Sequence, residues 1–123
     1  MYPPATREIA RTRRDLAPET QSAFDTFSRE VFAEGALSAK MKQIVAVAVA
    51  HATQCPYCIK AHTRMALRSG ATREELMEAI WVATEIRAGG VYAHSALAID
   101  VFDEEQARRK GSPGKDGGSA GGT

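Results

Sequence analysis

The middle of the chain reads Cys55-Pro56-Tyr57-Cys58-Ile59-Lys60-Ala61-His62. These are the only two cysteines in the sequence, and a histidine follows the second of them by four residues. Because residues three and four apart lie on one face of a helix, Cys55, Cys58 and His62 converge if this stretch is helical. Two thiols that can close a disulfide, beside an imidazole that can accept a proton, predict a redox site.

The segments on either side of the first cysteine predict two helices. Every residue from 44 to 50 is apolar, and Ser38 can cap the start, so residues 39–52 are expected to form a helix that is buried all round. The next helix is expected to begin near Pro56, because proline suits a first helical turn, and to end at Gly70. The cysteine pair therefore lies at a helix N-terminus.

Helical patterns cover the rest of the ordered chain as well. Apolar residues recur at helical spacing in residues 18–34, and Thr72 and Glu75 have the spacing of a capping box. The helix that starts there is expected to break near Gly89-Gly90, with a last helix over residues 91–108. No convincing pair of strands is present, so the fold class is predicted to be all-α.

The composition along the chain suggests three parts. Residues 1–17 form a basic N-terminal arm with a short helix near residues 6–15, residues 18–109 form the helical domain, and residues 110–123 form a Gly/Ser-rich tail that we expect to be disordered. The arginines of the arm are not interleaved with aromatic residues, so we interpret the arm as solvated and expect no nucleic-acid partner.

The bulk properties narrow the class of protein further. The formal net charge of the 123 residues is +1, which gives no argument for an acidic partner. No apolar run is long enough to span a bilayer, and the start of the chain does not look like a secretory signal, so no membrane association and a cytoplasmic location are expected. In a reducing compartment a lone Cys-x-x-Cys is more often catalytic or metal-binding than structural.

The spacing of the motif favours a two-step reaction with a peroxide. A free thiol titrates near pH ~8.5, but a helix N-terminus and a nearby imidazole favour the thiolate. One thiolate attacks the peroxide O–O bond and becomes a sulfenic acid, and the neighbouring thiol condenses with it to a disulfide. Cys55 lies nearer the helix start, and Cys58 lies one turn from His62. We predict that Cys58 attacks and that Cys55 resolves.

Metal binding is the alternative chemistry for the same residues. Two cysteines and a histidine could hold zinc, but a structural site needs a fourth ligand, which His51 or His94 would have to supply. Covalent haem attachment is excluded because Ile59, not histidine, follows the second cysteine. We therefore expect neither a metal nor another cofactor, and we interpret His94 as a hydrogen-bonding residue at a helix contact.

Two upstream residues are further candidates for the site. His51 precedes Cys55 by four residues and is either a core histidine satisfied by a backbone carbonyl or part of the redox site. Gln43 lies two helical turns before His51, and its amide could reach the same pocket. An amide cannot carry a proton as a carboxylate would, so Gln43 is expected to orient its partner rather than to titrate.

Three stretches together resemble one protein family. They are KQIVAVAVAHATQCPYCIKAHT (42–63), GATREEL with Ala79-Ile80 (70–80), and RAGGVYAH (87–94). Over about residues 20–102 they resemble the alkylhydroperoxidase D-like branch of the carboxymuconolactone decarboxylase family. The resemblance implies an all-helical fold that assembles into homo-oligomers, as trimers or hexamers. It also implies a thiol-dependent peroxidase that is recycled by a dithiol reductant, such as a lipoyl or thioredoxin-like protein.

The chain departs from this family at one position. In the family, a glutamate twelve residues before the first cysteine forms a proton relay with the motif histidine, and this chain has Gln43 there. The replacement puts the relay in question but not the dithiol; His51 is the closest substitute and Glu85 a weaker one. The family also contains lactone decarboxylases, whose chemistry does not depend on a cysteine pair, so the intact Cys55/Cys58 pair argues against that activity.

A non-enzymatic protein is the competing class. The same residues fit a helical oligomer that senses redox state, or a metal-stabilised binding module with the dithiol as its switch. In either class we expect oligomer formation, because about one hundred ordered residues cannot bury all of the aromatic side chains they carry. These aromatic residues are Phe24, Phe27, Phe32, Trp81, Tyr92 and Phe102.

Overall fold

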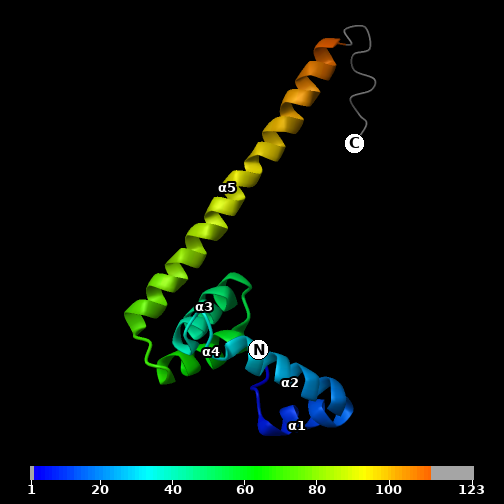
Figure 1. The fold of residues 1–123 in the computed structure, drawn as a ribbon. Helices are drawn as coiled ribbons and strands as arrows, with labels where there is room; N and C mark the ends of the chain where they lie inside the picture. The colour runs from blue at the N-terminus through cyan, green and yellow to red at the C-terminus, as the bar shows by residue number, and fades with distance from the viewer. Residues whose placement is uncertain (1, 112–123) are drawn as a thin grey trace. The chain divides into compact units, whose positions relative to one another are not determined.

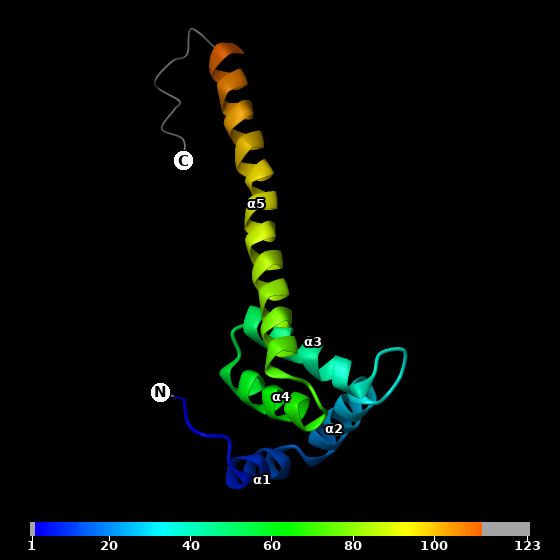
Figure 2. The same cartoon turned by 90° about the vertical axis from the view of Figure 1, so that its left-hand side faces the viewer.

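The computed structural model describes residues 2–111, and all of its regular structure within that range is helical, as the sequence predicts. The chain divides into two compact units, the first ending at Thr84 and the second beginning at Glu85. The last helix contributes residues to both units. The helices, labelled in Figures 1 and 2, are α1 (Arg7–Leu16), α2 (Pro18–Phe32), α3 (Ala39–Ala52), α4 (Pro56–Arg68) and α5 (Arg73–Gly111).

The core of the first unit lies where α3 packs against α4, side by side in both ribbon views (Figures 1 and 2). Val47 on α3 is 1% exposed and Ala66 on α4 is fully buried. The small alanine lets the two helices approach closely, and Leu76 from the first turn of α5 belongs to the same cluster. Ala79 and Ile80, one turn further along α5, pack against the same cluster.

Only one side of α3 is buried, which corrects the expectation of a helix buried all round. Val47 points into the core, whereas Val45 is 45% exposed and Val49 is 53% exposed. Residues two apart on a helix differ by about 200° in direction, so Val45 and Val49 point away from α4. The continuous apolar run therefore supplies a core face and, on the opposite side, an uncovered apolar face.

The turn between α3 and α4 is a Schellman motif, a helix end in which two N–H groups fold back onto the last carbonyls. The Gln54 N–H donates to the His51 carbonyl (3.2 Å) and the Cys55 N–H donates to the Ala50 carbonyl (3.0 Å). The motif needs a left-handed residue in the middle, and Gln54 takes that conformation with φ 57°. The chain therefore leaves α3 in a tight turn that ends at the first cysteine.

The end of α4 repeats this motif with the glycine that the sequence indicated. The N–H groups of Gly70 and Ala71 donate to the Leu67 and Ala66 carbonyls (3.0 and 2.9 Å), and Gly70 has φ +97°. A glycine meets no steric penalty in this conformation. The turn leads directly to the first residues of α5.

The start of α5 is the predicted capping box. Thr72 Oγ1 accepts from the Glu75 N–H (3.0 Å), and Glu75 Oε1 accepts from the Thr72 N–H (2.9 Å). Lys40 on α3 pairs with the same carboxylate at 3.2 Å. The hydrogen bond from the Thr72 backbone, assisted by Lys40, lowers the pKa of Glu75. The carboxylate thus helps to tie α5 to α3.

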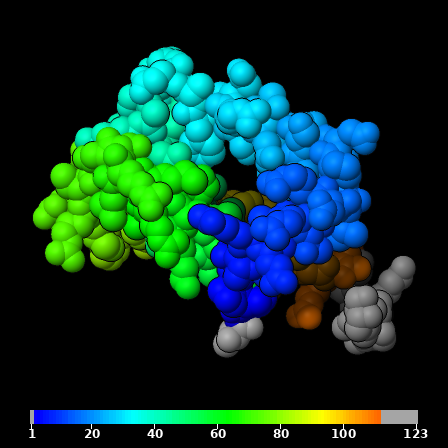
Figure 3. All heavy atoms as spheres, turned by 90° about the horizontal axis from the view of Figure 1, so that it is seen from below, coloured from blue at the N-terminus to red at the C-terminus, as the bar shows by residue number. Residues whose placement is uncertain are grey.

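The N-terminal arm contacts the start of α4. The short helix expected there is confirmed as α1, with Thr6 accepting from the Ile9 N–H (3.2 Å) as its cap. Ahead of it, the Pro3 carbonyl accepts from the Tyr57 hydroxyl (2.6 Å), and the rings of Tyr2 and Tyr57 meet edge to face. Figure 3 shows this blue segment against green α4.

In the second unit, α5 runs through Gly89-Gly90, so the predicted break is wrong. Each glycine costs a helix about 1 kcal/mol relative to alanine, which weakens the helix there but does not interrupt its backbone hydrogen bonds. Large apolar side chains of this unit remain exposed, including Tyr92 (81%) and Leu97 (65%). Lys110 and Gly111 of the predicted tail belong to α5, and residues 112–123 lie outside the described part of the chain.

None of the described helices combines the length and the apolar character that crossing a membrane requires.

The capping box makes a prediction about stability. Thr72→Ala removes the hydroxyl that accepts the Glu75 N–H, so the free energy of unfolding should fall by about 1 kcal/mol. Thr72→Ser keeps the acceptor and should recover most of the loss. Urea denaturation followed by circular dichroism measures the difference. Equal stability of the alanine and serine variants would show that the cap contributes nothing.

Candidate redox site

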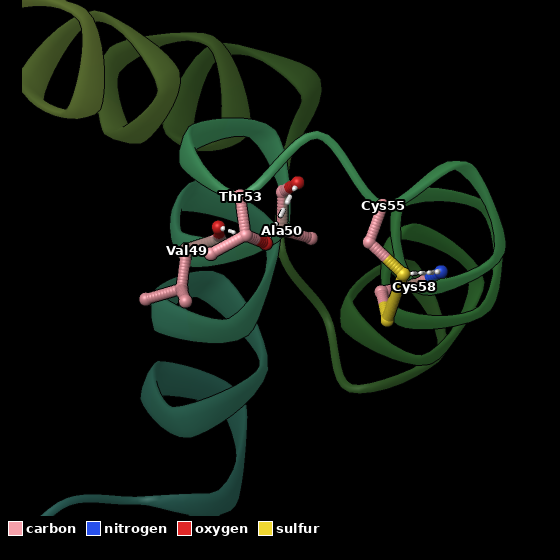
Figure 4. The surroundings of a disulfide bond; sticks show 5 residues. All are labelled: Val49, Ala50, Thr53, Cys55 and Cys58. Carbon is pink, nitrogen blue, oxygen red and sulfur yellow. Dashed lines mark hydrogen bonds between the residues drawn. A yellow bond between two sulfur atoms is a disulfide. The ribbon is translucent and has the colours of Figure 1, made fainter. Parts of the chain in front are cut away.

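The two cysteines occupy the first turn of α4 and form a disulfide (Figure 4). Cys55 is the N-cap residue, Cys58 lies three positions later, and their Cα atoms are 5.3 Å apart. The Cys58 N–H donates to Cys55 Sγ (3.3 Å), so the first sulfur already acts as the acceptor that a helix start requires. Both residues are partly buried. The predicted Cys-x-x-Cys at a helix N-terminus is therefore confirmed.

Cys55 connects the two helices of the core through different atoms. Its backbone N–H bonds the Ala50 carbonyl and ends α3, while its sulfur caps α4. Pro56 follows at the first helical position, where the missing N–H costs no hydrogen bond. Thr53 Oγ1 donates to the Val49 carbonyl at 3.0 Å and holds the end of α3 (Figure 4).

A hydrogen bond joins Gln43 on α3 to His62 on α4. The distance between Gln43 Oε1 and His62 Nδ1 is 2.8 Å, and Gln43 is the buried polar residue of the core, 8% exposed. An amide oxygen only accepts, so His62 Nδ1 donates and Nε2 keeps a lone pair. Such an imidazole is held in the tautomer that can accept a proton at Nε2. The sequence suggested that the Gln43 amide could reach the site, and in the structure it contacts the motif histidine.

Phe32, the last residue of α2, stacks on the His62 ring. The ring centroids are 5.1 Å apart and the planes differ by 23°. Sequence reasoning did not select Phe32 for the site. Its position in the helical pattern of residues 18–34 marks it as an apolar residue, and nothing local shows which ring it meets.

The other two histidines bond within their own helices. His51 Nδ1 lies 2.8 Å from the Val47 carbonyl, which fits the expectation of a histidine satisfied by a backbone carbonyl. His94 Nδ1 lies 2.8 Å from the Gly90 carbonyl, in the second unit. The structure thus joins Gln43 to His62 and Cys55 to Cys58, and it ties His51 to α3 rather than to either cysteine.

The described part of the chain contains no set of side chains suited to bind a metal ion. Within residues 2–111, no three side chains of histidine, cysteine, aspartate or glutamate gather closely enough to hold an ion. The two cysteines are also already bonded to each other. Cys55, Cys58 and His62, the first three ligands of the zinc alternative, do not form such a group in the described part of the chain.

Comparisons with known proteins agree with the fold. The model of the carboxymuconolactone decarboxylase family matches residues 18–100. "Uncharacterized protein 4 in cox locus" of Paracoccus denitrificans is 52% identical over 102 residues, which are 83% of this chain and 91% of that protein. The match to the family model begins at the first residue of α2 and includes the whole stretch from Cys55 to His62.

Solved structures give the same result. A protein from Methanobacterium thermoautotrophicum superposes with a TM-score of 0.65 at 34% identity, over 68% of this chain and 94% of that one. A carboxymuconolactone decarboxylase family protein from Legionella pneumophila superposes with a TM-score of 0.61 at 34% identity, over 79% and 86% of the two chains. This chain therefore shares both sequence and fold with a solved member of that family.

The Gln43–His62 bond makes a prediction about the imidazole. The neutral His62 ring should carry its hydrogen on Nδ1, which the ¹⁵N chemical shifts of the two ring nitrogens report. Gln43→Leu keeps the side-chain size and removes the acceptor, so the share of this tautomer should fall. His94, whose Nδ1 bonds a backbone carbonyl, serves as the internal reference and should not change. A native His62 protonated mainly at Nε2 would contradict the assignment.

Proposed function

This chain belongs to the carboxymuconolactone decarboxylase family, and we propose that it is a thiol-dependent peroxidase that cycles Cys55 and Cys58 between dithiol and disulfide. Its substrates are hydrogen peroxide or organic hydroperoxides. The observation that carries the proposal is the disulfide in the first turn of α4, whose first sulfur accepts a helix N–H. A sulfur in that position is stabilised as a thiolate by the unpaired N–H groups and the positive end of the helix dipole.

The proposed cycle starts from the reduced pair. The Cys58 thiolate attacks one oxygen of the peroxide, the O–O bond breaks, and the other oxygen leaves as an alcohol or water after taking a proton. Cys58 is now a sulfenic acid, oxidised by two electrons. The Cys55 thiolate attacks its sulfur, and the hydroxyl group leaves as water with a second proton. The product is the disulfide seen in the structure.

The residues around the sulfurs have separate roles in this proposal. His62 follows Cys58 by one helical turn, so its Nε2 lone pair is the acceptor for the Cys58 thiol proton. Gln43 orients the ring through Nδ1 and does not titrate. Cys55, whose sulfur accepts the Cys58 N–H, takes the resolving role, because it lies one turn further from His62 than Cys58 does. We assign no step to His51, whose ring bonds its own helix.

A dithiol must reduce the disulfide for the cycle to continue. We propose a protein dithiol, of the lipoyl or thioredoxin-like kind, acting in a reducing compartment such as the cytoplasm. Cys55 and Cys58 are partly buried residues at the start of α4, and in this proposal an external thiolate attacks one of their sulfurs. Sustained peroxide consumption with excess dithiol separates an enzyme from a redox sensor, which would react once per chain.

We also propose that the chain works as a homo-oligomer. In the first unit Met41, Val45 and Val49 form an exposed apolar stripe along α3. In the second unit the helix of residues 85–111 exposes Leu97 and other large apolar side chains. A single helix is marginally stable in water without packing against an apolar partner. A second copy of the chain, which carries the same apolar surfaces, is the proposed partner.

The assignment of the two sulfurs makes a prediction about peroxide kinetics. The native protein should lose two thiols per chain, and Cys55→Ser should lose one thiol at a similar rate and stop at a sulfenic acid. Cys58→Ser should react more slowly by on the order of a hundredfold, because the remaining Cys55 lies two helical turns from His62 and lacks the nearby general base that takes the Cys58 proton. Stopped-flow kinetics with thiol titration measures all three.

Two outcomes of this experiment count against the proposal. Native-like oxidation of Cys58→Ser would assign the attack to Cys55 instead. If neither native thiol reacts faster than free cysteine, the chain is not a peroxidase.

Stoichiometric zinc in protein that was purified without added metal would favour the binding-module alternative.

The oligomer is tested by light scattering at micromolar concentration. The measured mass should be a multiple of the single-chain mass. Leu97→Lys replaces the exposed apolar side chain by a charged one, which is costly to bury in an interface, so the mass should shift toward that of the monomer. Gln106→Lys adds the same charge to the same helix at a polar position and should leave the mass unchanged. A stable native monomer would contradict the proposal.

A further inference from the structure

The His62 ring is constrained from two directions by residues of two different helices. Gln43 on α3 accepts from Nδ1 at the edge of the ring, at 2.8 Å. Phe32 at the end of α2 lies against the face of the ring, with the centroids 5.1 Å apart and the planes inclined by 23°. Both His62 and Phe32 are partly buried, so the contact lies within the protein rather than on a freely solvated surface.

The two contacts remove different motions. A single hydrogen bond fixes where Nδ1 points but leaves the ring able to rotate about the N···O direction. A stacked ring fixes the plane but does not distinguish the two edges of the imidazole. Together they determine both the plane and the edge, and hence the direction in which Nε2 points.

The end of α2 is itself held in place beside this stack. Lys42 Nζ donates to the Ala33 carbonyl at 2.6 Å, one residue beyond Phe32. Glu34 Oε2 accepts from the Ala39 N–H at 2.9 Å and caps the N-terminus of α3. A cation that bonds a terminal carbonyl stabilises a helix end. The connection from α2 to α3 is thus anchored at both ends, and Lys42 is the direct neighbour of Gln43.

We infer that Phe32 is a positioning residue for the redox site: its ring holds the plane of the His62 imidazole, so that Nε2 is aimed at the thiol it serves. Phe32 acts through His62 and touches neither substrate nor sulfur in this role. The inference rests on the proposed function for its effect on rate. Its structural part, the orientation of the ring, concerns the oxidised protein and stands independently of peroxide chemistry.

The test uses three variants of the full chain. Phe32→Leu removes the aromatic face and keeps an apolar side chain, whereas Phe32→Tyr keeps the face. Phe27→Leu makes the same change on the same helix at a residue that stacks on Phe24 and is 62% exposed, and it serves as the matched control. If Phe32→Leu does not fold, Phe32→Met, which also lacks a ring, takes its place.

Nuclear magnetic resonance of the oxidised proteins reads the orientation directly. In the native protein and in Phe32→Tyr, the carbon-bound ring protons of His62 should show the ring-current shift of a stacked aromatic, and the Nδ1–H should exchange slowly with water. In Phe32→Leu the shift should vanish and the exchange should speed up by about tenfold or more. An unchanged His62 spectrum in Phe32→Leu would overturn the inference, whether or not the protein reacts with peroxide.

The rate of disulfide formation with hydrogen peroxide gives the second readout. Phe32→Leu should slow it by about tenfold, with Phe32→Tyr and Phe27→Leu within about twofold of the native rate. If Phe27→Leu slowed disulfide formation as much as Phe32→Leu does, the slower rate would reflect general destabilisation, and the positioning role of Phe32 would be overturned. If the native protein itself fails to react, the proposed function fails, and the His62 spectrum still decides whether Phe32 holds the ring.

Discussion

The candidate redox site depends on one residue that ends one helix and begins the next. The backbone N–H of Cys55 closes the Schellman turn of α3, and its sulfur caps α4. The turn requires a left-handed residue, and the chain places Gln54 there with φ 57°. A non-glycine residue in that conformation costs of order 1 kcal/mol or more, which the packing of α3 on α4 must offset. The position of the first sulfur is therefore fixed by the helix pair rather than by the motif alone.

The same pairing of α3 and α4 assembles the rest of the site. Gln43 and His62 are far apart in sequence, and they meet because each helix contributes one of them across the packed interface. The amide at this position supplies direction without charge, since it accepts one hydrogen bond and exchanges no proton. A carboxylate there would add a titrating group beside the imidazole. In the structure, the His62 imidazole is thus oriented by an uncharged partner.

Local patterns in the sequence predicted most of the first unit and less of the second. Ser38, the Thr72–Glu75 pair and Gly70 each satisfy backbone groups within a few residues, so the helix ends they mark are where the sequence puts them. The predicted helix break at Gly89-Gly90 is wrong, because a glycine lowers helix propensity without removing a backbone hydrogen bond. The contact of Phe32 with His62 depends on how α2 meets α4, which no local pattern encodes.

The separation of the two cysteines has a consequence for the fold as a whole. Their disulfide closes a loop of only a few residues inside one helical turn. In the chain-entropy description, such a small loop restricts the unfolded chain by about 2 kcal/mol, against about 4.7 kcal/mol for a hundred-residue loop. The bond is therefore a weak constraint on the unfolded chain, and the first unit is held together mainly by the packing of α3 on α4 rather than by this cross-link.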